Sequence, residues 1–360
     1  MKCAIVQHEA VHEEVIPSFI YIFSLLGVKV DVFLNKTIEY RRGDLFSEFD
    51  VIDANINYVD LNNKKDWDSL HSLIIKQQYD FIYSNTFQRE GVMEWVLSLG
   101  KPVIGLVHNV KIFSDSNGQE KLKKFNREIS LFTLANHVSR SLKESFFDFE
   151  YQPKIFNATS CIWPRSNDDP YELNEIRTIG IPGGVNFDNR DFVSLVDAVA
   201  SNKDIISNVK FIVMGGGRDR VKLQNLCTDK GVDSFFRFLK TSSESGMVLY
   251  EDYVKEINAV TFIDPLTHND SQYGSTKITS AIPTALGFLK PVYTNENFAF
   301  STGFSCFATR LNRGESLKAY SSISTESYSD YIDIVSFEKQ SQLIKFKLDM
   351  AHALNEMKLT

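Results

Sequence analysis

The sequence has few cysteines, and none of them lies in a recognisable motif. The 360 residues include 4 cysteines, Cys3, Cys161, Cys227 and Cys306, which are far apart and form no CxxC or zinc-ribbon spacing. Scattered thiols in a chain of this length indicate reduced core residues, because small secreted domains use closely spaced cysteines as disulfide frameworks. The pattern predicts a cytoplasmic protein.

Long apolar runs are also missing. No stretch of ~18 apolar residues, the length that a membrane-spanning helix needs, occurs in the sequence. Near the start only Ala4-Ile5-Val6 precede Gln7 and His8, which is far shorter than the apolar segment of a signal peptide. We therefore expect a chain that neither spans a membrane nor is exported by a signal peptide.

The sequence lacks the excess of basic residues that proteins binding nucleic acid need. The formal net charge is −7 and the isoelectric point is near 5.6, so nucleic acid is not an expected partner. Apolar residues make up 43% and charged residues 24%, as in ordinary globular proteins. At ~150 residues per domain, the length suggests about two domains.

Two familiar phosphate-binding motifs are missing as well. Gly215-Gly216-Gly217 follows an apolar run, but a GxGxxG motif would need glycine where Arg220 stands, and no GxxxxGK[ST] sequence occurs. Hydride transfer and P-loop phosphoryl transfer therefore lose their main support. The Gly216 amide could still contact an anion at the start of the next helix, although a tight turn explains the glycines equally well.

The sequence does contain a regular alternation of short apolar runs and longer helix-like stretches. This alternation predicts an α/β fold of parallel sheets with crossover helices. Strands are expected at residues 2–6, 28–33, 81–83, 102–107, 131–134, 177–181, 209–214, 235–239, 260–263 and 291–293. Turn-forming residues at 163–170 interrupt the pattern, as at a domain junction.

The interruption divides the chain into two expected Rossmann-like domains. We predict a first domain at residues 1–165 and a second domain at 166–335. Apolar residues at helical spacing predict a terminal helix at 336–360, which we expect to pack back on the first domain.

His8-Glu9-Ala10-Val11-His12 matches the HExxH zinc motif, but its context is unfavourable. His8 directly follows an apolar strand, and a helix begun there would carry Pro17 in its interior. A helix that starts near Val15 places Pro17 in its first turn, where proline is tolerated. We therefore predict a loop here and no metal site.

This loop lies at the carboxyl end of the first strand, where ligands bind in open α/β sheets. His12 and Glu13 belong to it, and His108 follows another apolar strand at the same edge. All three are candidate catalytic bases for a substrate hydroxyl. A hydrogen-bonded loop residue remains the alternative for each histidine.

In the second half, glycines and cations occupy the corresponding edge. Gly183 and Gly184 close its first strand, and Arg190 follows at the next helix, an arrangement suited to a diphosphate. The loop from His268 to Lys277 adds polar candidates before a predicted helix: Tyr273, Ser275, Thr276 and Lys277.

Within this loop, Ser275 or Thr276 could instead cap the helix. Lys277 in a first helical turn would oppose the helix dipole unless an anion sits there.

Two other segments have competing interpretations. Asp66-Trp67-Asp68 resembles a metal-binding DxD pair, but Asp at a helix start is better explained as a cap. The segment 119–128 is basic with apolar interruptions and could rest on an anionic membrane surface, although a solvated helix face is the simpler interpretation.

In layout and in three segments, the chain resembles GT-B glycosyltransferases, and its second half resembles the donor domain of a large nucleotide-sugar family. That family builds bacterial surface polysaccharides. The similarity rests on residues 179–198, 209–226 and 263–294, where Ala285-Leu286-Gly287-Phe288-Leu289-Lys290-Pro291-Val292 is similar to the family's helix ending.

The resemblance implies two facing domains, with a nucleotide sugar bound by the second and an acceptor by the first. It places Arg190 on the donor diphosphate, the amides of Gly183 and Gly184 beside it, and His108 on the acceptor side. The family's two glutamates fall on Thr276 and Thr284, so we expect the neighbouring loop residues to supply the sugar and phosphate contacts.

We therefore expect a metal-independent hexosyltransferase that acts on a glycan or lipid-linked glycan. Its co-substrate would be a nucleotide diphosphate sugar, and we expect no other cofactor. We expect a cytoplasmic protein that can associate with the inner face of the cytoplasmic membrane. A sugar-nucleotide epimerase on the same fold and a non-catalytic sugar-nucleotide-binding protein remain alternatives.

Overall fold

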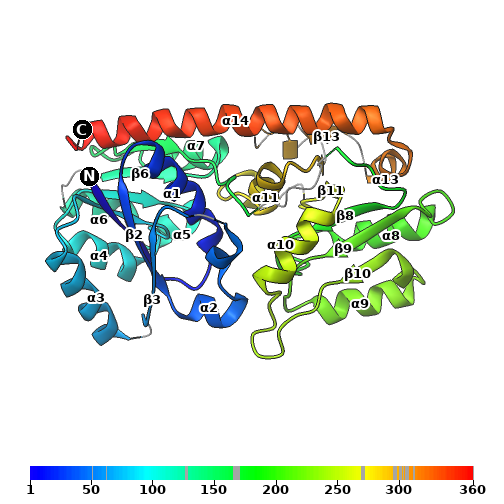
Figure 1. Ribbon diagram of the computed structural model, residues 1–360, viewed down its shortest axis with the longest axis horizontal. Helices are drawn as coiled ribbons and strands as arrows, with labels where there is room; N and C mark the ends of the chain where they lie inside the picture. Colours follow the sequence, from blue (N-terminus) through cyan, green and yellow to red (C-terminus); the bar gives the residue numbers. More distant parts are fainter. Residues whose placement is uncertain are drawn as a thin grey trace.

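A computed structural model shows two α/β domains side by side, joined by one long helix (Figure 1). The structure describes residues 1–50, 52–61, 63–125, 129–164, 171–268, 272–294, 298–299, 302, 304, 308–310 and 313–359. Cys306 and parts of the predicted 119–128, 163–170 and 268–277 segments lie outside these residues.

The first domain is a 7-stranded parallel sheet in the order β3-β2-β1-β4-β5-β6-β7. Its strands are β1 (Lys2–Gln7), β2 (Lys29–Asn35), β3 (Asn55–Val59), β4 (Phe81–Ser84), β5 (Val103–Leu106), β6 (Ile129–Thr133) and β7 (Lys154–Asn157). The crossover helices include α1 (Ile16–Leu25), α2 (Thr37–Arg42), α3 (Lys64–Lys76), α4 (Glu90–Ser98), α5 (Val110–Asp115), α6 (Gly118–Phe125) and α7 (Asn136–Glu144).

The second domain repeats this architecture with a 6-stranded parallel sheet in the order β10-β9-β8-β11-β12-β13. Its strands are β8 (Arg177–Ile181), β9 (Val209–Val213), β10 (Phe236–Phe238), β11 (Phe262–Ile263), β12 (Val292–Thr294) and β13 (Ala308–Arg310). The helices used below are α8 (Phe192–Asn202), α9 (Arg220–Asp229), α10 (Tyr250–Ala259) and α11 (Ala281–Phe288); α13 (Arg313–Ser322) follows β13.

Helix α14 (Thr325–Glu356) spans both domains along one side of the molecule (Figure 1). Near its start, the Tyr328 hydroxyl donates to the carbonyl oxygen of Thr261 in the second domain, at 3.1 Å. Near its end, the Phe346 ring packs on Phe19 of the first domain, with centroids 4.8 Å apart. The helix thus packs on the first domain as predicted, but it begins before residue 336 and anchors to the second domain too.

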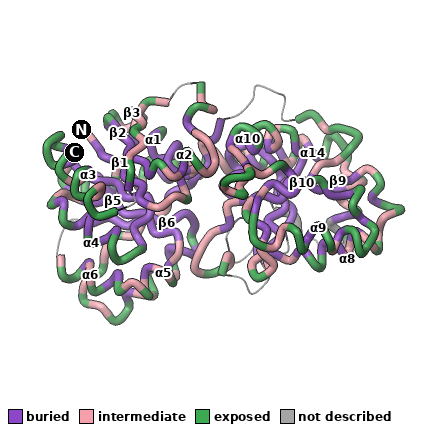
Figure 2. The backbone as a smooth tube through the Cα atoms, turned by 90° about the horizontal axis from the view of Figure 1, so that it is seen from below, coloured by how far each residue is buried: buried purple, intermediate pink, exposed green. Residues whose placement is uncertain are grey.

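Buried residues fill both domains, as Figure 2 shows in the burial colouring. One apolar cluster runs from the first domain across the interface into one face of the second sheet, and another fills the rest of the second domain. Central strands such as β1 and β4 are buried almost throughout, because helices cover both faces of a parallel sheet. Their continuous apolar runs made them easy to predict from the sequence. The edge strands β3 and β7 escaped prediction, because polar residues alternate with apolar ones there.

The HExxH segment is a loop, as predicted. Strand β1 ends at Gln7, His12 has a left-handed backbone with φ 72°, and Pro17 lies in the first turn of α1. The His8 ring is buried between the rings of Trp67 and Trp95, with centroids 4.6 and 4.5 Å away. In the described part of the chain, no group of three or more His, Cys, Asp or Glu side chains could hold a metal ion.

None of the helices among the described residues combines the length and hydropathy needed to cross a membrane.

Candidate active site between the two domains

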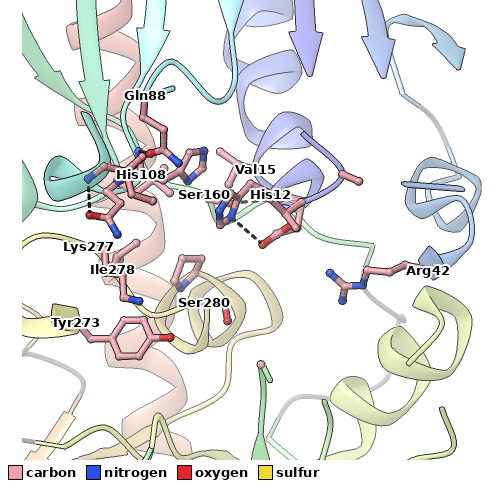
Figure 3. A pocket seen from close by; sticks show the side chains of 18 of the residues that line it. His12, Val15, Arg42, Gln88, His108, Ser160, Tyr273, Lys277, Ile278 and Ser280 are labelled. Atoms are coloured by element: carbon pink, nitrogen blue, oxygen red, sulfur yellow. Dashed lines mark hydrogen bonds and ion pairs between the residues drawn. The ribbon is translucent and has the colours of Figure 1, made fainter. Parts of the chain in front are cut away.

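A cavity of about 410 Å³ lies between the domains (Figure 3). The loops after β1 and β5 and the end of α2 line it from the first domain, and the loops after β8 and β11 line it from the second. These loops follow the carboxyl ends of parallel strands, where α/β folds bind their ligands. A smaller cavity of about 200 Å³ adjoins it and is lined by the glycines of the second domain.

Positive charge predominates among the described residues that line the main cavity. Arg41, Arg42 and Lys277 are cationic, whereas Glu14 is the one carboxylate in this lining. Arg42 lines both cavities and Lys277 faces it across the main one (Figure 3). Cations from two domains therefore meet at the same space, which suits a multiply charged anion.

The position of Lys277 is set by backbone contacts across the domain boundary. Lys277 pairs with Asn109 as an isolated antiparallel bridge, and its carbonyl oxygen lies 3.1 Å from His137 Nε2. Its ammonium group lies over the Tyr273 ring, 4.4 Å from the centroid. The α11 helix begins only at Ala281, so Lys277 precedes the helix instead of lying in its first turn, where the sequence placed it.

Glycines let three backbone segments of the second domain come together beside the smaller cavity. A Cβ atom on Gly215 would overlap the backbone of Gly183, and one on Gly216 would overlap the backbone of Gly246. Gly183 and Gly184 line this cavity together with Gly216. The predicted glycines therefore form one backbone wall of the smaller cavity, in which only glycine fits at 215 and 216.

His12 and His108 lie in contact on the first-domain side. The His108 ring is buried, and its Nε2 lies 2.6 Å from the carbonyl oxygen of Asn85. Because a carbonyl oxygen only accepts, Nε2 carries the proton and Nδ1 of neutral His108 keeps a lone pair. Burial, and then the nearby His12, lowers the pKa of His108 well below its usual value.

Two side-chain contacts orient these histidine-bearing loops. Gln88 Oε1 accepts hydrogen bonds from the backbone amides of His108 and Asn109, at 3.0 and 2.9 Å. His12 Nδ1 lies 3.9 Å from Glu14 Oε1, a pair that is charged only when the imidazole is protonated. The Glu14 carboxylate also has a buried Oε2 without a hydrogen-bond partner among the described residues.

Glu13, the third predicted base, lies away from the cavity. Its side chain is fully buried, accepts a hydrogen bond of 2.5 Å from the Tyr250 hydroxyl, and lies 3.7 Å from Arg42. The Arg42 guanidinium in turn lies 4.1 Å over the Tyr250 ring. Burial raises the pKa of Glu13, and the neighbouring Glu14 adds to this effect. The structure thus makes Glu13 part of a domain-interface cluster.

Arg190 lies one layer behind the cavity wall. The residue is 3% exposed, its Nη1 donates to the carbonyl oxygen of Pro265 at 2.5 Å, and its Nη2 sits directly against Gly183. Burial lowers the pKa of Arg190. Gly183, which lines both cavities, therefore stands between the Arg190 guanidinium and the cavity space.

The threonines and serine that the sequence suggested around the 268–277 loop do not gather at one place. Ser275 is exposed, whereas Thr276 Oγ1 is buried without a hydrogen-bond partner among the described residues. Neither caps α11, whose N-cap is Ser280. Thr284 is buried on α11, lies 3.2 Å from the Tyr253 hydroxyl through its Oγ1 and lines the smaller cavity.

The structure thus brings many of the predicted site residues to the two cavities. Those that line a cavity are His12, His108, Gly183, Gly184, Gly216, Tyr273 and Lys277. Sequence reasoning placed Glu14 at this edge but did not single out Arg42 or Trp163 as site residues. Arg41-Arg42 at the end of a short helix was a visible signal, but nothing in the sequence indicated that this helix would face the second domain.

Comparisons with known proteins show which fold this is. Protein-family models give no match, and neither do curated proteins. Solved structures do match over nearly the whole chain. HepE of Anabaena, crystallised with UDP and glucose, has a TM-score of 0.62 at 14% identity, covering 99% of each chain.

Two further structures share the arrangement. WaaG, a glycosyltransferase involved in lipopolysaccharide biosynthesis, has a TM-score of 0.59 at 12% identity, covering 98% of this chain and 99% of its own. A candidate UDP-N-acetylglucosamine 2-epimerase from Listeria monocytogenes has a TM-score of 0.54 at 8% identity, covering 96% and 90%. The chain has the GT-B fold, with two facing Rossmann-like domains and a C-terminal helix that returns to the first.

Proposed function

We propose that this protein is a glycosyltransferase that moves a hexose from a nucleotide diphosphate sugar to a glycan or lipid-linked glycan. The observation that carries the proposal is the convergence of Arg42 and Lys277, from opposite domains, on the main cavity, which adjoins a smaller cavity walled by glycine backbone. Beside it, His12 and His108 stack on the first-domain side. Likeness to HepE, which was crystallised with UDP and glucose, supports a nucleotide-sugar donor.

The cations would act on the leaving group. When the bond from the sugar's anomeric carbon to the phosphate oxygen breaks, its electron pair leaves with the nucleoside diphosphate. Arg42 and Lys277 stabilise this charge most when it is fully developed, which lowers the barrier rather than merely tightening ground-state binding. With two side-chain cations available, we propose that the reaction needs no metal ion and no further cofactor.

The first domain would hold the acceptor. The acceptor hydroxyl oxygen forms the new bond to the anomeric carbon and must lose its proton. His12 is our proposed base in an inverting reaction, because its ring is partly exposed in the cavity lining. Burial lowers the pKa of His108, so this ring stays neutral and would accept a hydrogen bond from a sugar hydroxyl through Nδ1.

A lipid-linked acceptor would place the protein at the inner face of the cytoplasmic membrane. Helix α6 supports this part of the proposal, because Lys123 and Lys124 in its last turn would add positive charge near anionic lipids. WaaG, with the same fold, is described as acting in lipopolysaccharide biosynthesis.

The first experiment separates transferase, epimerase and pure binding protein. Thermal unfolding is measured with uridine, guanosine, thymidine and cytidine diphosphates; a nucleotide at 100 times its dissociation constant adds ~2.7 kcal/mol of stability. The sugar nucleotide of the stabilising base is then incubated alone and with candidate acceptors, each with and without EDTA. A metal-independent transferase forms product only when an acceptor is present, and it forms that product equally well with EDTA.

Other outcomes would replace this proposal. An altered sugar in the incubation without acceptor would show an epimerase. Nucleotide binding without turnover on any acceptor would favour a binding protein. Activity lost in EDTA and restored by a divalent cation would overturn the metal-independent part alone.

A further inference from the structure

Helix α14 carries an exposed apolar row that the fold does not use. Ile334, Phe337, Ile344 and Leu348 are 38%, 74%, 64% and 66% exposed. With the exposed Ser341 between them, they are spaced alternately by three and four positions, the repeat that forms a seam between paired helices. We call these five residues the outer stripe.

The outer stripe lies on the opposite side of the helix from the residues that hold α14 to the domains. The buried residues of α14 include Ile332, Val335, Phe346 and Met350. At about 100° per residue, the mean direction of the outer stripe is roughly 180° away from theirs. The stripe therefore faces outward along the side of the molecule on which α14 lies (Figure 1).

Charges along the two flanks of the outer stripe change sign at its middle. Asp333 and Glu338 flank its first half on opposite sides, whereas Lys347 and Lys345 flank its second half on the corresponding sides. An antiparallel copy of the helix, related by a twofold axis at Ser341, would place Asp333 beside Lys347 and Glu338 beside Lys345. A parallel copy would place like charges together.

We propose that the outer stripe pairs with the outer stripe of a second copy of this chain, in an antiparallel helix contact across a twofold axis. The pattern is self-complementary in both apolar positions and charge, which is what a twofold interface requires. Ile334 of one copy would lie beside Leu348 of the other, because each is seven positions from Ser341. The pairing leaves the cavities between the domains open, since none of the described residues that line them belongs to α14.

The flank charges favour a second copy over a membrane surface. Anionic lipids would attract Lys345 and Lys347 but repel Asp330, Asp333 and Glu338, which occupy the first half of the same face. A second copy would place lysines beside the acidic half of the outer stripe and acidic residues beside the basic half. The seam from Ile334 to Leu348 is about 21 Å long at 1.5 Å per residue, so we expect a dissociation constant in the micromolar range rather than an obligate dimer.

Sedimentation velocity of the full chain over a range of micromolar concentrations tests the proposal. We expect the mass to rise from 41.1 kDa toward twice that value as the concentration increases. Phe337→Glu together with Ile344→Glu should weaken dimerisation by about tenfold or more, because both copies then bring each new carboxylate into the apolar contact. Val221→Glu, an equally exposed site on α9, is the matched control and should leave the dimer unchanged.

A charge exchange tests the antiparallel orientation. Asp333→Lys alone sets lysines against each other at both flanking contacts, and Lys347→Asp alone does the same with aspartates, so each variant should dimerise more weakly. An equimolar mixture should restore the dimer as a heterodimer. Nucleotide-induced thermal shifts equal to those of the unmodified chain would show that each variant is folded.

A mass of 41.1 kDa at every concentration would overturn the proposal. So would a dimer that survives Phe337→Glu with Ile344→Glu. If the chain stays monomeric but binds vesicles of anionic phospholipid, and this double variant abolishes the binding, the occupant of the outer stripe is a membrane.

Discussion

The rings of His12 and His108 stack with their centroids 4.1 Å apart and their planes 13° from parallel. His12 follows β1 and His108 follows β5, so the contact arises because parallel strands end at one edge of the sheet. Positive charge on one ring opposes protonation of the other, and His12 is indeed one cause of the lowered pKa of His108. The pair thus keeps a neutral ring beside the cavity.

His12→Phe should slow glycosyl transfer and leave donor binding intact. The phenyl ring can keep the stack on His108 but cannot take the acceptor proton, so kcat should fall by about 10²-fold or more. Steady-state kinetics and nucleotide titration on the same preparation measure both quantities. An unchanged kcat would remove His12 as the base and favour a retaining reaction.

Lys277→Ala and Arg42→Ala should each weaken nucleoside diphosphate binding by ~1–3 kcal/mol, the range for charge-assisted contacts. The exposed Lys29 at the opposite end of the sheet provides the control, and Lys29→Ala should have no effect. Calorimetric titration at two salt concentrations gives the affinities. Full affinity in both cleft variants would refute the proposed diphosphate site.

Arg190→Ala tests whether a buried cation acts through the cavity wall. We expect nucleoside diphosphate affinity to fall by less than in the Lys277→Ala and Arg42→Ala variants, because the guanidinium lies behind Gly183 and acts only through space. Stability should fall as well, since a buried side chain is removed, so the titration is run on protein shown to be folded by circular dichroism. Unaltered affinity would limit Arg190 to holding the loop at Pro265.

Gly215→Ala should destabilise the second domain and abolish nucleotide binding. The added methyl group overlaps backbone atoms of Gly183, which cannot rotate away as a side chain would, and such overpacking costs ~1–3 kcal/mol. Denaturant unfolding measures the loss. Gly91→Ala, on α4 with no atom within 4 Å of the new methyl group, should instead stabilise the chain by ~0.5–1 kcal/mol.

Stability should fall in mild acid because of His8. Burial lowers the pKa of His8 from 6.5 to about 3, so the unfolded chain binds a proton that the folded one resists. Above pH 6.5 His8 is neutral in both the folded and the unfolded chain, so it does not oppose folding. As the pH falls from 6.5 toward 3, only the unfolded chain binds the proton, and the folded protein becomes less stable. Between pH 7 and 5 the loss from His8 is ~2 kcal/mol.

His8→Phe should reduce this acid sensitivity by the same ~2 kcal/mol, since it removes the titrating group. It breaks no hydrogen bond, because neither ring nitrogen of His8 has a partner among the described residues. Denaturant unfolding of both chains at the two pH values provides the comparison. Parallel pH profiles would show that the acid sensitivity comes from other groups.

Sequence periodicity was sufficient for the central architecture. Strands such as β1 and β8 are short apolar runs followed by turn residues, and Gly27 ends the first helix with φ 69°. The loop nature of the HExxH segment also followed from local rules, because Pro17 can occupy only the first turn of a helix. The glycines and histidines at strand ends were visible candidates, since strand ends locate the ligand edge.

Local sequence patterns could not predict the charged contacts between the domains. Arg42, Glu13 and Tyr250 form one cluster although they come from α2, the loop after β1 and α10. Their burial, which decides that Glu13 faces Tyr250 rather than the cavity, depends on how the two domains pack. The sequence by itself determined two parallel α/β sheets and their ligand edges, because hydrophobic periodicity acts over a few residues. Only the tertiary structure decided which charges meet in the cavity, because that depends on contacts between segments far apart in the chain.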